Sequence, residues 1–239
     1  MAAKLKSIIG RIHWSLLARG FAFGLGWLLL PAWLFFALAI GLYLIPFFRP
    51  YKLAFPFLLV LIYALRSPAS FWIAVFLGGT LYCLLGIKDL VFIDRTAAYE
   101  ILTFLIVFLY IFGFFGAFGS WNSGGFLAAF GLSSLSFLLL RGLFGYTEHE
   151  FAEAGEPLKH PTLVAGIMSL LFFEALVAGL FLPLAPFYQA AFAFLIAFIG
   201  IDICLLFVRR TLAPKNLLVN FTIFFVVFSA LVGSASWGL

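Results

Sequence analysis

Two carboxylates interrupt long apolar stretches of the sequence, and they are the residues best placed to do chemistry. Glu174 lies near the middle of the run 162–182, and Asp202 lies six residues before the last residue of the run 187–208. An ionised carboxylate that faces lipid is costly, so we expect each acid to face protein or water, or to be protonated. Such acids form ion or proton paths in transporters, and they also hold helices together.

The two apolar runs are joined by the short linker 183–186, which predicts an antiparallel hairpin. Asn220 and Arg141 approach the depth of Asp202 from two other runs, so we predict a polar cluster of these three side chains. Glu174 differs from Asp202 in depth by about 9 Å, which would make it a second site along one ion or proton path. The alternative interpretation is a polar clasp between helices.

The linker that follows the run 126–140 carries acidic residues and histidines. If residues 147–154 are helical, His149 and Glu153 share one face and form a candidate pair of ligands for a divalent ion. The alternative is a solvated acidic loop, and we favour it. We therefore expect no metal and no other cofactor.

The segment Gly131-Leu132-Ser133-Ser134 resembles the serine motif of rhomboid intramembrane proteases. That chemistry needs a general base within reach of the serine. None of the three histidines lies in a predicted span, so the motif does not predict a protease, and haem held between spans by histidines is excluded as well. The predicted spans also lack a lysine, which excludes a retinal Schiff base, because Lys88 is assigned to the linker after the run 69–87.

The composition defines the elements that must position these residues. Of 239 residues, 66% are hydrophobic and 10% are charged, and the mean hydropathy is +1.22. A soluble domain is about 45–50% apolar and about 25% charged. These values exclude a soluble, a disordered or a nucleic-acid-binding protein, and they predict a multi-spanning helical membrane protein.

The predicted fold class is all-α, a polytopic transmembrane bundle of seven to eight apolar helices. Residues 1–20 are predicted to form an amphipathic helix at the membrane interface, and residues 21–239 a single transmembrane domain. Either 53–65 or 21–48, which is broken at Pro31, is expected to enter the membrane and return without crossing it. The apolar runs are 21–45, 53–65, 69–87, 97–118, 126–140, 162–182, 187–208 and 217–237.

The 14 Lys and Arg residues, which give a net charge of +5, predict the orientation of the chain. Linkers with and without positive charge alternate from residue 88 onward, so the charged linkers are placed in the cytoplasm. The C-terminus is then outside and the N-terminus inside, in a membrane of the bacterial cytoplasmic type. The partners that we expect are membrane lipids, together with other membrane subunits or, through the spacing of Gly20 and Gly24, further copies of the chain.

The functional class that we favour from the sequence is a small transporter, channel or permease component that uses the intramembrane carboxylates. The alternative is a non-catalytic structural or scaffolding subunit of a larger membrane complex. A lipid-processing enzyme at the inner leaflet is the third interpretation, and it is the weakest because no nucleophile–base pair or set of metal ligands is visible.

Overall fold

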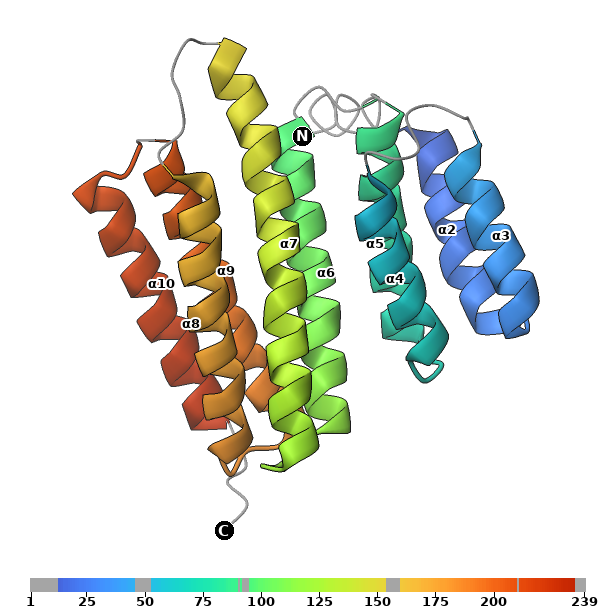
Figure 1. Ribbon diagram of the computed structural model, residues 1–239. Helices are drawn as coiled ribbons and strands as arrows, with labels where there is room; N and C mark the ends of the chain where they lie inside the picture. Colours follow the sequence, from blue (N-terminus) through green and yellow to red (C-terminus); the bar gives the residue numbers. More distant parts are fainter. Residues whose placement is uncertain are drawn as a thin grey trace, which may run out of the picture. The chain divides into compact units, whose positions relative to one another are not determined.

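The chain is helical throughout its described regular structure (Figure 1). The computed structural model describes residues 13–45, 53–89, 91, 95–153, 160–209 and 211–234, with the backbone alone at 95 and 146–153. Six of the helices in these ranges are long and apolar enough to cross a membrane. They are α5 (Phe71–Lys88), α6 (Arg95–Ala117), α7 (Ser123–Glu153), α8 (Pro161–Phe181), α9 (Pro186–Val208) and α10 (Pro214–Ser234). The predicted all-α polytopic class is confirmed.

The first apolar run, 21–45, is divided between two helices, with the break at Pro31 that one of the alternatives names. Helix α2 (Trp14–Leu29) and helix α3 (Ala32–Leu44) pack against each other on either side of Pro31. Proline disfavours helical backbone at the preceding residue, and Leu30 is accordingly extended. Helices of 16 and 13 residues rise about 24 Å and about 20 Å, less than the hydrocarbon thickness of about 30 Å. The re-entrant path of this segment stays a prediction.

The N-terminal region also departs from the predicted boundary at residue 20. Helix α2 begins at Trp14 and continues through that position. Residues 1–12, which make up most of the predicted interfacial helix, lie outside the described residues. The third short helix, α4 (Ala54–Arg66), coincides with the predicted run 53–65.

Helix α7 is much longer than the run 126–140 from which it was predicted. It starts at Ser123, where the Asn122 side-chain oxygen accepts a hydrogen bond of 2.6 Å from the Gly125 amide. Its 31 residues rise about 46 Å, more than a bilayer core requires. Much of the predicted linker 141–161 is therefore helical, as far as Glu153.

The close contacts within the chain fall into two compact units, 1–106 and 107–239, with the boundary inside α6. Each unit is described by itself, and the single membrane domain predicted over 21–239 stays a prediction. In the first unit, α2 packs tightly against α5 because both helices have small residues at the crossing. A Cβ atom built on Gly20 would lie 2.6 Å from the Gly78 carbonyl oxygen, and one on Gly24 would lie 2.6 Å from that of Ala74. The predicted glycine spacing thus joins two helices of the same chain.

In the second unit, polar side chains join helices at several depths. The Ser133 hydroxyl of α7 donates to the Ser169 carbonyl of α8 at 2.6 Å, and the Ser169 hydroxyl donates back to the Ser133 carbonyl at 3.2 Å. At the start of α9, the fully buried Gln189 amide donates to the carbonyls of Gly119 and Leu182, at 3.2 and 2.9 Å. Gln189 therefore joins the two linkers without positive charge, 118–122 and 182–185.

Candidate functional site

The structure brings two of the predicted site residues into direct contact. The Asn220 side chain of α10 donates a hydrogen bond of 2.7 Å to Asp202 Oδ2 on α9. Asn220 is buried and Asp202 is half-buried. The contact arises because α9 and α10 form an antiparallel hairpin and place both residues at the same level.

A second polar contact shows that this pair belongs to a regular helix–helix interface. The Tyr188 hydroxyl donates to the Ser234 carbonyl at 2.9 Å, at the opposite end of the same hairpin. The two contacts are 14 positions apart on each helix, which is close to four full turns, so they lie on the same face of α9 and of α10. Between them the Phe192 and Phe228 rings meet at 5.9 Å. The pair therefore has the geometry of a polar clasp.

The polar clasp between Asp202 and Asn220 is important for the attachment of α10, because few other side chains of this helix are buried. Asn220 is its one buried residue within Pro214–Ser234. We expect Asn220→Leu to lower the free energy of unfolding by about 1–2 kcal/mol, because it leaves the Asp202 carboxylate without this donor. Thermal unfolding in mild detergent measures the change. Asn216→Leu on the same helix is the matched control, since Asn216 makes only a local hydrogen bond of 3.2 Å to Thr211; equal shifts for the two variants would contradict the clasp.

Arg141, the third member of the predicted cluster, lies exposed on α7. The register fixed by Ser133 and Ser169 places Arg141 level with the start of α8, and about 20 Å along the helix axis from Glu174. Within the described residues no ion pair joins Arg141 to either carboxylate. The pair that forms is thus Asp202 with Asn220, and Arg141 stands apart from it.

Glu174 occupies an exposed position on the outer side of α8. It lies about 10 Å from the C-terminal end of the helix and about 20 Å from its start. Among the described residues it has no hydrogen bond or ion pair, and none joins it to Asp202. Its exposed neighbours on α8 are apolar, and we call this surface the Glu174 face: Leu170, Leu171, Glu174, Ala178 and Phe181.

Two further motifs of the sequence have different outcomes. The side chains of His149 and Glu153 lie outside the described residues, although the backbone of α7 is helical through both. Ser133 and Ser134, in the segment that resembles a protease motif, both donate to backbone carbonyls, at 2.6 Å to Ser169 and at 2.9 Å to Phe130. Their hydroxyls stabilise helices.

A buried charge cluster in the first unit was missed in the sequence analysis. Lys88, which was assigned to a linker, is the last residue of α5, and its side chain is 0% exposed. Its Nζ lies 3.4 Å from Asp89 Oδ1, and Asp89 Oδ2 lies 3.4 Å from Arg19 Nη1. Asp89 is 8% exposed and Arg19 is 27% exposed. The assignment of Lys88 to the linker after the run 69–87 was therefore wrong.

The cluster stabilises the C-terminal end of α3. Lys88 Nζ donates to the carbonyl of Tyr43 and lies 5.1 Å from the centre of the Tyr43 ring, which in turn stacks on Phe57 at 4.1 Å. Arg19 Nη1 donates to the Ile45 carbonyl at 2.9 Å. The last carbonyls of a helix lack partners within the helix and carry partial negative charge, so cations are favourable there. The Asp89 carboxylate pairs with both cations and balances one of their two positive charges.

The described part of the chain therefore shows to which structural class of protein it belongs. Long apolar helices whose interior polar groups bind one another are the signature of a polytopic α-helical integral membrane protein. No protein family, no curated protein and no solved structure matches the chain.

Proposed function

We propose that the protein is a non-catalytic subunit of a larger membrane assembly, and that the Glu174 face of α8 contacts a partner. The observation that supports this proposal is the exposed position of Glu174 well inside an apolar helix. An aspartate or basic residue that faces lipid at the centre of a helix costs about 2.5–3.5 kcal/mol, and a glutamate is similarly unfavourable. A partner that supplies hydrogen bonds or positive charge removes that cost.

The chemistry of the Glu174 face supports one kind of partner. Its other exposed residues are Leu170, Leu171, Ala178 and Phe181, which suit an apolar helix. The charge of Glu174 is complementary to a lysine or arginine in the middle of that helix, and such pairs are how charged side chains are accommodated within membranes. We therefore infer a transmembrane helix of a different protein that carries a basic residue at mid-membrane depth.

The charge pattern of the linkers supports one orientation for this assembly. The linkers 118–122 and 182–185, which Gln189 joins, carry no Lys or Arg. By the positive-inside rule they lie outside, with the C-terminus, while the charged linkers lie in the cytoplasm. We infer a membrane of the bacterial cytoplasmic type, with the N-terminus inside.

Photo-crosslinking in the native membrane tests the partner contact. A benzophenone amino acid at Leu171, one turn from Glu174, is expected to crosslink one other membrane protein that has a basic residue in mid-span. Because losing one member of a buried charge pair costs about 2–5 kcal/mol, Glu174→Gln should reduce this crosslink at least about tenfold. The same amino acid at Phe225, exposed on α10, measures the background.

Two controls make the outcome decisive. The thermal stability of the isolated chain should not change with Glu174→Gln, because the carboxylate is exposed. Glu174→Lys should restore the crosslink when the basic residue of the partner is changed to glutamate. Crosslinks to lipid alone, or only to copies of this chain, would overturn the proposal.

A transporter that works through the intramembrane carboxylates is the second candidate. The observation that favours it is the Asp202–Asn220 pair, which places a half-buried carboxylate between two apolar helices. If the protein is such a transporter, the purified chain alone supports ion or proton flux into liposomes, and Glu174→Gln abolishes that flux. On the subunit proposal the purified chain carries none.

A further inference from the structure

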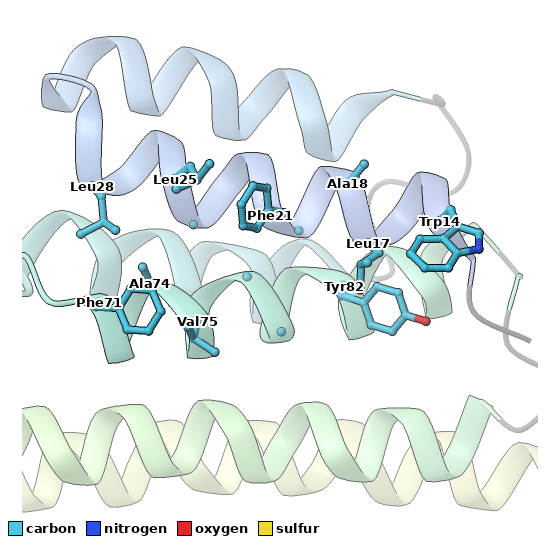
Figure 2. Close-up of a pocket in the computed structure, with 14 residues that line it drawn as sticks. Trp14, Leu17, Ala18, Phe21, Leu25, Leu28, Phe71, Ala74, Val75 and Tyr82 are labelled. Carbon is cyan, nitrogen blue, oxygen red and sulfur yellow. The ribbon is translucent and has the colours of Figure 1, made fainter. Parts of the chain in front are cut away.

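Hollows on the surface of the described helices differ in what they offer a ligand. One, of about 510 Å³, runs along α2 and α5, and Figure 2 shows its apolar and aromatic lining between Trp14 and Phe71. Apolar surface does not distinguish a lipid chain from a partner helix, because both are apolar. Another, of about 420 Å³, lies between α7 and α8 in the second unit. We call it the serine notch, and its lining includes Ser133, Ser134 and Leu138 of α7 and Gly166, Ser169 and Leu170 of α8.

The serine notch is open because small residues face each other across α7 and α8. Gly166 is half-buried, and a Cβ atom built on it would meet nothing within 4 Å. Ser134, on the α7 side, is exposed. One turn further along, the space between the same helices is filled, since the Phe173 ring packs against those of Phe126 and Phe130 at 5.4 and 6.3 Å. The notch is therefore a local gap between two helices that are otherwise closely packed.

The hydroxyl groups of the serine notch offer hydrogen-bond acceptors. Ser133 and Ser169 donate to each other's backbone carbonyls, and Ser134 donates to the carbonyl of Phe130 at 2.9 Å. A hydroxyl has one proton to donate and two lone pairs that accept. Among the described residues no hydrogen bond is donated to these three oxygens. The hydroxyls of the notch can therefore bind a donor, whereas their own protons are already used.

The serine notch is continuous with the Glu174 face, because Leu170 belongs to both. Leu170 lies one turn before Glu174, and Ser169 lies about 8 Å before it along the axis of α8. An ionised carboxylate is likewise an acceptor without a proton to donate. Two separate features of one surface thus require hydrogen-bond donors, and the hydrocarbon chains of lipids supply none.

Building on the proposed function, on which this inference rests, we propose that the partner helix of the Glu174 face docks along both α7 and α8 and places a second donor in the serine notch. Its basic residue contacts Glu174. A Ser, Thr, Asn or Gln four positions away lies on the same side of that helix and donates to the serine oxygens. Four residues rise about 6 Å, and the long side chain of the basic residue covers the remaining distance.

Crosslinking from α7 in the native membrane tests the docking position. A benzophenone amino acid at Leu138, which is 46% exposed at the edge of the notch, is expected to crosslink the same protein as one at Leu171 of α8. The crosslinked span should carry Ser, Thr, Asn or Gln four positions from its basic residue. Phe225 of α10 again measures the background. If Leu171 yields that protein and Leu138 does not, the notch contact is overturned while the subunit proposal stands.

Filling the notch tests whether the partner occupies it. Gly166→Leu places a side chain in the notch and should reduce the crosslink from Leu171 about tenfold, which is within the usual cost of overpacking. Gly131→Leu is the matched control and should leave the crosslink unchanged. Gly131 is a helical glycine of α7 that does not line the notch, and a Cβ there also meets nothing within 4 Å.

Removing one acceptor tests the hydrogen bond itself. Ser134→Ala should reduce the crosslink from Leu171 about threefold, the effect of one interhelical hydrogen bond in a membrane. Ser136→Ala is the matched control, because Ser136 also donates to a carbonyl of its own helix, at 3.0 Å, and does not line the notch. The melting temperature of the isolated chain identifies any variant that fails to fold, and Ser134→Ala remains the test if Gly166→Leu is such a variant.

The outcomes distinguish failure of the notch contact from failure of the subunit proposal. A crosslink that survives Gly166→Leu in a folded chain, or that falls no more with Ser134→Ala than with Ser136→Ala, overturns the notch contact alone. A wild-type chain that crosslinks no other protein from Leu171 overturns both.

Discussion

Asp89→Ala is expected to lower the free energy of unfolding by about 3–5 kcal/mol, the largest effect of any single substitution considered in this protein. Lys88 is fully buried beneath the C-terminal end of α3, and its Nζ lies 3.4 Å from Asp89 Oδ1. Removing the carboxylate leaves a buried ammonium group without its compensating charge, and Arg19 loses the same partner. Thermal or denaturant unfolding of the chain in mild detergent measures the change.

A double variant distinguishes loss of the ion pair from loss of packing. Replacing both charges, in Asp89→Ala with Lys88→Met, should be less destabilising than Asp89→Ala alone, because no uncompensated ammonium group remains buried. Lys215→Met, at an exposed cation in the first turn of α10, is the control and should change stability by no more than about 0.5 kcal/mol. The single variant Lys88→Met is measured as well. If its loss of stability and that of Asp89→Ala simply add in the double variant, the two charges are not coupled.

Gly78→Leu is expected to destabilise the first unit by about 3 kcal/mol, the upper end of the usual cost of overpacking. A Cβ at this position would lie 2.8 Å from the Gly20 carbonyl oxygen, and a backbone atom cannot move aside as a flexible side chain can. The two helices must therefore separate, and their packing is the tightest helix–helix contact of this unit. The melting temperature in mild detergent measures the loss.

The neighbouring glycine supplies the control. Gly79→Leu introduces the same side chain one position away on the same helix, where a Cβ meets nothing within 4 Å. Leucine is the better helix former by roughly 0.5–1 kcal/mol at both positions, so propensity cancels in the comparison. If Gly78→Leu and Gly79→Leu unfold at the same temperature, close packing at the α2–α5 crossing is not what stabilises this unit.

The long helices of the chain were predictable from sequence because an apolar run of about 20 residues has few alternatives in a membrane. The runs 162–182 and 187–208 became α8 and α9 within one residue at each end. The run 21–45 was open to two interpretations, a continuous span or a segment broken at Pro31, because hydropathy does not register a break in the helix. Pro31 was the available signal, and it marks the turn between α2 and α3.

The contact between Asp202 and Asn220 was predictable, whereas the position of Glu174 was not. A short linker between two antiparallel runs fixes the level at which residues face each other, and that places Asp202 beside Asn220. The side of a helix that faces its neighbours is predicted from a contrast between polar and apolar faces. In α8 the only polar residues are Thr162, Ser169 and Glu174, too few to define such a contrast. The position of Glu174 along its helix could therefore be predicted from the sequence, but the side of the helix on which it lies could not.

The buried cluster at Lys88 was missed because a cation at the end of an apolar run has two interpretations. Charge counting assigns it to a linker as a topology signal. In the structure it instead reaches under α3 to the Tyr43 carbonyl. The adjacent Asp89 was the one local hint, since an acid next to a lysine at a helix end permits burial of both, but the contact with Arg19 spans 70 residues and no local pattern reveals it.

Native mass spectrometry of the protein, taken from its own membranes in mild detergent, is the most direct test of a partner contact at Glu174. The wild-type chain of 26.5 kDa is predicted to carry another membrane protein in fixed stoichiometry, and Glu174→Gln is predicted to release it. The released partner should contain a basic residue in the middle of a span. A wild-type chain found alone, or only with copies of itself, would contradict the assignment of this protein as a subunit of a larger assembly.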